Sequence, residues 1–426
     1  MGGCQEAARR PSPSPEISQP DHPLHLQDPE YLRDLPIPPW INRPQPTWRR
    51  YIQNITPSWF AINMGTGVVS ILLYNQPYQA RWLHILAYIV FVLNIVLFVG
   101  IFVASILRYI LYPELWRVML RHPVQSMYIG TLPMGFATII NMIVFACVPH
   151  WGDWARTLAV SLWIVDAAVS ICCCLLLPFI MMFKHPRSKP TDMTAVWLFP
   201  VLPNIVASAT GAIVADALPN PQHAFWTMIT CYVLWGMAVP MALAIIAIYF
   251  NRLITYKLPP RDVIVSVFLP CGPTGQGAFA IMKLGQVAHK VFPRTHALPA
   301  VAAAGDILYV FGFLAGLVLW AFGLVWLFFA FASVSRSRFP FNMGSWSCTF
   351  PIGVWVTATI TIGKELPSTF FNVVGIIFSI CVIIFWLAVS ILSIQKAFTG
   401  DLFYAPCVAA LECRATILEK SEESSA

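Results

Sequence analysis

The sequence predicts an all-α integral membrane protein with ten transmembrane helices, arranged as five tandem helical hairpins. Of its 426 residues, 58% are hydrophobic and only 11% are charged, whereas soluble domains carry about a quarter charged residues. Apolar segments long enough to cross a bilayer, about 20 residues each, recur ten times. Lys and Arg gather on one side of these segments, and Gly and Pro gather in every second segment.

The ten predicted spans divide the chain into a membrane domain and two tails. Residues 1–56 are polar and Pro-rich, and we expect a largely disordered cytosolic N-terminal tail. Residues 57–396 form the ten-helix membrane domain, and residues 397–426 form a cytosolic C-terminal tail. The predicted spans are 57–75, 82–107, 125–148, 157–182, 193–217, 223–249, 262–285, 300–332, 342–363 and 368–395.

The distribution of Lys and Arg tests this topology independently. With both termini in the cytosol, 20 of the 26 Lys and Arg residues fall on the cytosolic side and 6 on the opposite side. Cytosolic loops of membrane proteins carry such an excess of positive charge. The net charge of +7 therefore reflects topology, and we expect no nucleic-acid partner.

Gly and Pro distinguish two kinds of span. The odd spans hold 19 of these residues in 114 positions, and the even spans hold 9 in 140. Broken helices at membrane depth are tolerated where protein or a water-filled cavity satisfies the freed backbone groups. We therefore expect five kinked odd helices that form an inner ring around a pore, enclosed by five even helices. Tolerated packing kinks are the alternative. The expected kink residues are Gly65, Gly67, Pro133, Gly135, Pro203, Gly272, Gly275, Gly277, Pro351 and Gly353.

Five segments of the chain resemble the tellurite-resistance/dicarboxylate transporter family, and most closely its fungal sulfite-exporting branch. They read MGTGVVSILLYNQPYQARWL, GTLPMGFATIIN, IAIYFNRLITYKLPP, GPTGQGAFAIM and GSWSCTFPIGVW. The resemblance extends over roughly residues 57–396. It implies ten helices in a quasi-fivefold ring around one central pore per protomer, and a homotrimer. The ring agrees with the alternation of Gly and Pro.

The resemblance also implies a pore gate. In the channel branch of the family, a Phe in a Phe-Pro pair of the ninth helix occludes the pore, and the matching residue here is Phe350 in SCTFPIG. An apolar ring in a narrow neck excludes water and so blocks ions until it rotates. The alternative is an ordinary core Phe.

An anion inside hydrocarbon needs hydrogen-bond donors in place of its water. Pairs such as Asn63 and Thr66, or Asn204 and Ser208, lie three or four residues apart and so share one helix face. No ring of Arg or Lys occurs at mid-membrane, which favours weak coordination by neutral groups. The candidate pathway residues are Asn63, Thr66, Thr131, Asn204, Ser208, Thr274, Gln276, Trp346 and Thr349.

Charged residues within the spans have separate interpretations. Asp166 lies in an even span, where a structural polar contact is favoured over a proton-coupling site. Lys283 and Lys364 lie near the outer ends of odd spans, where they reach the interface or shape the potential of an outer vestibule.

The resemblance implies a plasma-membrane exporter of sulfite or bisulfite that confers sulfite tolerance. A C4-dicarboxylate (malate) transporter or a less selective anion channel of the same family is the alternative. An interior-negative potential drives a single negative charge outward with about 2.3 kcal/mol per 100 mV, so no ATP is required. The nine histidines are scattered without an HExxH motif, which argues against an enzyme. We expect no cofactor and no metal, and membrane lipid as a partner.

Overall fold

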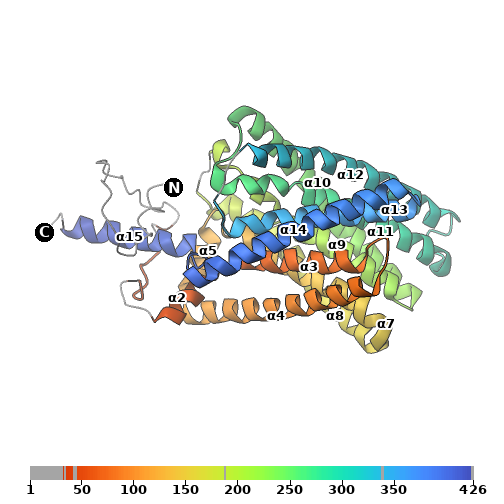
Figure 1. The fold of residues 1–426 in the computed structure, drawn as a ribbon, viewed down its shortest axis with the longest axis horizontal. Helices are drawn as coiled ribbons and strands as arrows, with labels where there is room; N and C mark the ends of the chain where they lie inside the picture. The colour runs from red at the N-terminus through yellow and green to blue at the C-terminus, as the bar shows by residue number, and fades with distance from the viewer. Residues whose placement is uncertain (1–31, 33–34, 42–45, 187–188, 337–339, 424–426) are drawn as a thin grey trace.

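The computed structural model describes residues 32, 35–41, 46–186, 189–336 and 340–423, and within these ranges every regular element is helical. The long helices run along the longest axis of the molecule (Figure 1). Most of the predicted N-terminal tail, residues 1–31, 33–34 and 42–45, lies outside the described residues.

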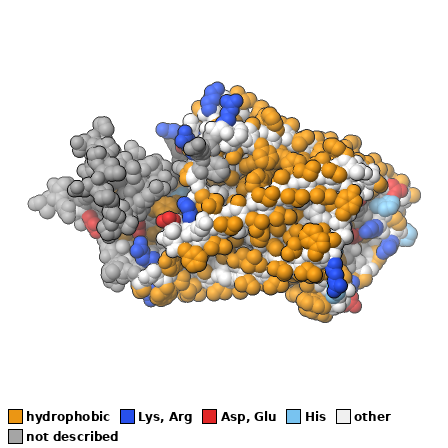
Figure 2. Space-filling view, in the orientation of Figure 1, with side chains coloured by type: hydrophobic (Ala, Val, Ile, Leu, Met, Phe, Trp, Pro, Cys, Tyr) orange, Lys and Arg blue, Asp and Glu red, His pale blue; other side chains and the backbone are white. Residues whose placement is uncertain are grey.

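Five long helices form the apolar exterior. They contain 31 to 36 residues each, and only 22–33% of the residues in their most apolar windows are buried. Figure 2 shows a broad hydrophobic surface, with Lys, Arg, Asp, Glu and His side chains concentrated toward its ends. These outer helices are α4 (Arg81–Leu111), α8 (Asp153–Lys184), α10 (Pro221–Tyr256), α12 (Ala304–Ser335) and α14 (Thr369–Thr399).

Five other helices are almost completely buried, and each follows a short 3₁₀ helix. The inner helices are α3 (Phe60–Tyr74), α6 (Thr131–Met142), α9 (Leu202–Ala217), α11 (Cys271–Thr295) and α13 (Thr349–Glu365). The preceding 3₁₀ helices are η2 (Pro57–Trp59), η3 (Met127–Gly130), η6 (Ala195–Leu198), η7 (Arg261–Phe268) and η8 (Met343–Cys348). The odd spans thus repeat one 3₁₀–α unit five times.

Prolines explain where four of these α-helices begin. Pro133, Pro203, Pro273 and Pro351 are the second or third residues of α6, α9, α11 and α13. Proline is tolerated in the first turn of a helix because the N–H group that it lacks would have no partner there. The glycines predicted to kink these helices lie inside uninterrupted α-helix, so the change of geometry precedes the prolines at the 3₁₀–α junctions.

By length and composition, seven helices among the described residues qualify as membrane spans. An eighth is obtained if α2 (Thr47–Gln53) and residues Pro57–Tyr74, which are bent by 80°, count as one span. The remaining odd spans contain the shorter helices α9, of 16 residues, and α13, of 17 residues. Their α-helical parts are short because each predicted span includes a 3₁₀ helix. The third span instead continues through a π-helix, Ile143–Cys147, into α7 (Val148–Trp151).

The inner helices contact one another in a closed order. α3 contacts α6, α6 contacts α9, α9 contacts α11, α11 contacts α13, and α13 contacts α3. Glycines permit the closest approaches. A Cβ atom at Gly275 would lie 2.5 Å from the Cα atom of Trp355, and one at Gly353 would lie 2.6 Å from a methyl of Val68. Small residues at these positions therefore determine the spacing of α11, α13 and α3.

A second, smaller hydrophobic cluster lies at the end of the molecule where α2, α5 (Glu114–Arg121) and α15 (Pro406–Glu423) gather (Figure 1). Leu115 and Val118 of α5 pack with Cys407 and Leu411 of α15. The fully buried Arg108 at the end of α4 donates hydrogen bonds to the Ile55 carbonyl oxygen at 3.0 Å and to the Cys407 sulfur at 3.2 Å. Part of the predicted C-terminal tail is therefore an ordered helix.

Candidate functional site

Eight of the nine candidate pathway residues lie on the inner helices and Trp346 lies on η8. Several of them direct their polar atoms toward the outer helices. Asn63 Nδ2 on α3 lies 3.2 Å from both the carbonyl oxygen and Oδ1 of Asn94 on α4. Asn94 Nδ2 in turn donates to Thr138 Oγ1 on α6 at 3.1 Å. These three side chains are 0–2% exposed, and they form a buried network that joins α3, α4 and α6.

The same arrangement recurs around the inner helices. Thr66 Oγ1 accepts a hydrogen bond from Trp386 Nε1 on α14 at 3.1 Å. Trp346 Nε1 donates to Ser393 Oγ on α14 at 3.0 Å. Ser208 Oγ donates to the Cys231 carbonyl oxygen on α10 at 2.8 Å. The sequence spacing predicts that Asn63 and Thr66 share a face, as do Asn204 and Ser208. Three of these four residues, Asn63, Thr66 and Ser208, therefore bond to outer helices.

Three predicted threonines bond to backbone carbonyl groups. Thr131 donates to Tyr128, Thr274 to Pro270 and Thr349 to Trp346, at 2.6, 2.9 and 2.9 Å. Hydroxyl groups in helices commonly bond in this way. Thr131 and Thr349 thereby tie the 3₁₀ helices η3 and η8 to the α-helices that follow, whereas Thr274 bonds to Pro270, the residue before α11.

Asn204 and Asp166 are buried, and their side-chain polar atoms have no hydrogen-bond partners among the described residues. Asn204 is 0% exposed, and neither its amide nitrogen nor its amide oxygen has a hydrogen-bond partner among the described residues. Asp166 on α8 is 1% exposed, and both of its carboxylate oxygens likewise lack a partner there. Trp163 Nε1 donates to the Ala207 carbonyl oxygen, and Asp166 and Asn204 each lie three residues from this contact, toward the same end of α8 and α9.

Phe350 lies in the first turn of α13 and is 3% exposed. It begins a series of residues spaced by four, three and four positions, namely Phe350, Val354, Thr357 and Thr361, which share one face of α13. Thr357 and Thr361 are partly exposed, although every other residue from 349 to 363 is buried. Both threonines lie within the predicted span 342–363, but they are not among the predicted pathway residues, because their partial exposure is visible only in the structure.

A comparable series follows α11. Gln276, Phe279 and Lys283 are spaced by three and four residues and so share a face. Their exposure increases along the helix, from 4% for Gln276 and 8% for Phe279 to a partly exposed Lys283. Gln276 is therefore the predicted pathway residue that lies in line with a charged side chain, Lys283, further along the same helix.

Charged side chains gather at the ends of α9, α11 and α13 that lie opposite α15. Asp216 on α9 accepts hydrogen bonds from Lys283 Nζ at 2.7 Å and from Lys290 Nζ at 2.6 Å. Glu365 accepts one from Gln286 Nε2 at 2.8 Å and another from Tyr309. Two helix ends of the inner group are thereby linked by ion pairs, and this end of the molecule is polar.

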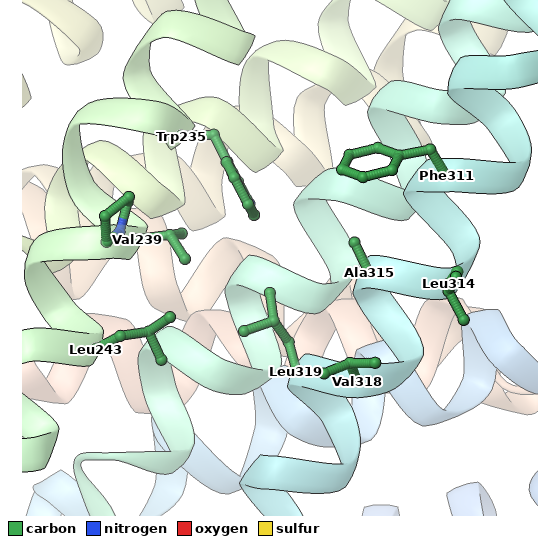
Figure 3. Close-up of a pocket in the computed structure, with 9 residues that line it drawn as sticks. Trp235, Val239, Leu243, Phe311, Leu314, Ala315, Val318 and Leu319 are labelled. Atoms are coloured by element: carbon green, nitrogen blue, oxygen red, sulfur yellow. The ribbon is translucent and has the colours of Figure 1, made fainter.

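An apolar pocket of about 420 Å³ lies between the outer helices α10 and α12 (Figure 3). Trp235, Val239 and Leu243 line it from α10, and Phe311 and Leu319 are among the lining residues from α12. The only hydrogen-bond donor among these side chains, Trp235 Nε1, already donates to the Gly277 carbonyl oxygen at 3.0 Å. The pocket therefore offers an anion no ligand.

Comparison with known proteins places these features in a family. The family model described as voltage-dependent anion channel, SLAC1, matches residues 54–394. A protein of Arthroderma benhamiae named sulfite efflux pump SSU1 is 51% identical over 352 residues, which cover 83% of this chain and 93% of the relative. A Candida albicans protein of the same name is 29% identical over 77% of this chain and 71% of its own length. The malic acid transport protein of Schizosaccharomyces pombe is 24% identical over 85% of this chain and 83% of its own length. The matched region contains all five 3₁₀–α units and their outer helices except the last five residues of α14, and the chain belongs to the voltage-dependent anion channel (SLAC1) family.

Proposed function

We propose that this protein exports sulfite or bisulfite across a fungal plasma membrane and thereby confers sulfite tolerance. Three fungal relatives that are named sulfite efflux pumps and are 51–52% identical over 83% of the chain support this substrate. The relative named for malic acid transport is far more distant, at 24% identity. A dicarboxylate or a broader range of anions remains the second candidate within the family.

The proposed pathway runs through the centre of the inner helices. Ten spans arranged as five hairpins would place the outer helices against lipid and the inner helices in a quasi-fivefold ring. The closed order of contacts from α3 through α6, α9, α11 and α13 back to α3 supports this ring. The five 3₁₀–α units support the internal repeat.

The contacts of α13 support our proposal for the face of this helix that borders the pathway. Trp355 and Thr359 face α12, because each forms a hydrogen bond with Trp320. Gly363 faces α14, where a Cβ atom would lie 2.4 Å from Asn372 Oδ1. The face that remains carries Phe350, Val354, Thr357 and Thr361.

This face supports Phe350 as the gate. The phenyl group of Phe350 would close the narrowest part of the pathway between the inner helices. The partly exposed Thr357 and Thr361 would lie beyond it on the same face of α13. A buried aromatic ring in a narrow passage excludes water, so an anion passes only when the side chain rotates. The single observation that carries the gate is this alignment of Phe350 with two partly exposed threonines.

Neutral groups would guide the anion. Gln276 on α11 is the donor that we place in the pathway. Thr357 on α13, whose hydroxyl donates to the Gly353 carbonyl oxygen at 3.0 Å, would line the pathway beside it. For the predicted residues that bond to outer helices, such as Asn63 and Ser208, we propose that they position the inner helices. Weak coordination allows the ion to leave again, and the membrane potential drives it outward with about 2.3 kcal/mol per charge per 100 mV.

The proposed orientation puts both termini in the cytosol, with α2, α5 and α15 at the cytosolic end. The excess of Lys and Arg on that side of the spans supports it. We further propose a homotrimer whose lipid-facing and subunit-facing surfaces are formed by the outer helices.

Sulfite release and sulfite tolerance in yeast cells that lack their own exporter test the proposal. Cells would carry the wild type, Phe350→Ala, Phe328→Ala or an empty vector, and malate uptake would be measured in parallel. Phe328 is 68% exposed on α12, so its loss controls for removal of a phenylalanine that faces lipid. We expect the wild type to restore tolerance, Phe350→Ala to raise the release rate, and Phe328→Ala to match the wild type.

Two results would overturn parts of this proposal separately. Malate uptake without sulfite release would assign the protein to the dicarboxylate transporters. Equal release by Phe350→Ala and the wild type, at equal surface expression, would remove Phe350 as the gate.

A further inference from the structure

The outer end of the inner ring carries more positive charges than its carboxylates neutralise directly. Lys283 and Lys290 share the two carboxylate oxygens of Asp216, at 2.7 and 2.6 Å. Lys364, in the last turn of α13, has its Nζ atom 3.4 Å from the Asn75 carbonyl oxygen at the end of α3. No ion pair links Lys364 to a carboxylate among the described residues.

Both lysines continue the faces that we assign to the pathway. Lys283 lies four residues after Phe279 and seven after Gln276 on α11, and Lys364 lies three residues after Thr361 on α13. α11 and α13 are neighbours in the ring. Two ammonium groups from adjacent helices therefore lie where the two faces reach the aqueous end.

We propose that Lys283 and Lys364 form an oxyanion-binding site at the outer mouth of the pathway, with Asp216 as a competing carboxylate. This assignment rests on the proposed function and names the groups that receive the substrate on the outer side. Ammonium groups are compact point charges with three donors each, which suits a small tetrahedral or pyramidal oxyanion. Because Asp216 already holds Lys283, an arriving anion must compete with it, so the site binds weakly and releases the ion to the medium.

Uptake of radiolabelled sulfite from the outer side, by plasma-membrane vesicles that contain the full chain, measures this site. We expect Lys283→Gln and Lys364→Gln each to raise KM by about three- to tenfold, because the lysines concentrate anions at the mouth. The maximal rate should change little in both variants. Lys364→Arg, which keeps the positive charge, should have the KM of the wild type. Asp216→Asn should act in the opposite direction and lower KM.

Arg81→Gln is the matched control. Arg81 lies at the same end of the molecule, is exposed, and belongs to the outer helix α4, so KM should not change. High salt should reduce the differences between the variants, since it screens exposed charges. Size-exclusion profiles identify a variant that fails to fold. If one of the three variants at Lys283, Lys364 and Asp216 fails to fold, the KM values of the other two test the site.

The two lysine variants and Asp216→Asn give opposite shifts only if these groups act on the anion. An unchanged KM in both lysine variants, or a raised KM in Asp216→Asn, would show that the ion pairs are structural and overturn the site. A wild type that moves no sulfite in these vesicles would instead refute the proposed function.

Discussion

Gly275→Ala tests how closely the inner helices must approach one another. A Cβ atom at this position would lie 2.5 Å from Trp355 Cα and 2.6 Å from Trp355 N. Carbon atoms in ordinary contact are 3.5–4.0 Å apart, so α11 and α13 would have to separate by about 1 Å. Trp355 cannot retreat easily, because it stacks on Trp320 with ring centroids 5.2 Å apart and donates to the Trp320 carbonyl oxygen.

Two effects of this substitution oppose each other. Overpacking of a tight core costs about 1–3 kcal/mol. Replacement of Gly by Ala inside a helix gains up to about 1 kcal/mol. We expect overpacking to prevail, since the nearest atoms belong to the backbone and cannot rotate away, so Gly275→Ala should be less stable than the wild type by about 1–2 kcal/mol. Sulfite release should fall as well, because the adjacent Gln276 would move.

The assay is thermal unfolding of the purified full chain in detergent, with sulfite release by cells as a second readout. Gly236→Ala on α10 is the matched control, because a Cβ atom there would meet nothing within 4 Å. The control should unfold at or above the wild-type temperature. Equal melting temperatures for Gly275→Ala and Gly236→Ala would refute the claim that the Gly275 contact sets the helix spacing.

Two further predictions concern buried polar groups. Asn94→Leu should lower the free energy of unfolding by about 0.6–1.7 kcal/mol, from the average to the largest value for a hydrogen bond between membrane helices, because it removes the bonds to Asn63 and Thr138. KM for sulfite should stay constant. A changed KM with unchanged stability would contradict the structural role of Asn94. Burial, with a smaller effect of His185, lowers the pKa of His122 from 6.5 to about 4, and its Nδ1 accepts two backbone N–H groups at 3.2 Å. The unfolded chain therefore binds more protons between these two pKa values, so the stability from neutral His122 is complete above pH 6.5 and is lost as the pH falls toward 4. The melting temperature of the wild type should fall over this pH range, and that of His122→Asn should fall less. If the melting temperatures of both proteins fell equally with pH, His122 would not be the group responsible.

Several features of the fold could be predicted from the sequence because they depend on composition and local order. The apolar segments predicted the bounds of four of the long outer helices to within four residues, as in α8 and α14, whereas α10 extends seven residues beyond its predicted end. The excess of Gly and Pro separated the buried inner helices from the exposed outer ones. It did not identify the 3₁₀ helices, because a proline near a helix start is compatible with both a kink and a new helix.

The candidate site depended more on tertiary structure. Asn94 could have been suspected from sequence as a lone amide in the apolar run FVLNIVLF, but its partners lie 31 and 44 residues away. The prediction for Phe350 rests on the resemblance, and the partial exposure of Thr357 and Thr361 on the same face of α13 appears only in the structure.

By itself, the sequence determined that this chain is a membrane protein, where its long apolar helices lie, and which residues share a helix face. Only the tertiary structure decided in which direction each face points. Asn63 and Thr66 share a face by spacing, yet they meet α4 and α14 because those helices lie outside α3. The physical reason is that helical periodicity relates residues within one helix, whereas the direction of a face depends on which neighbours bury it.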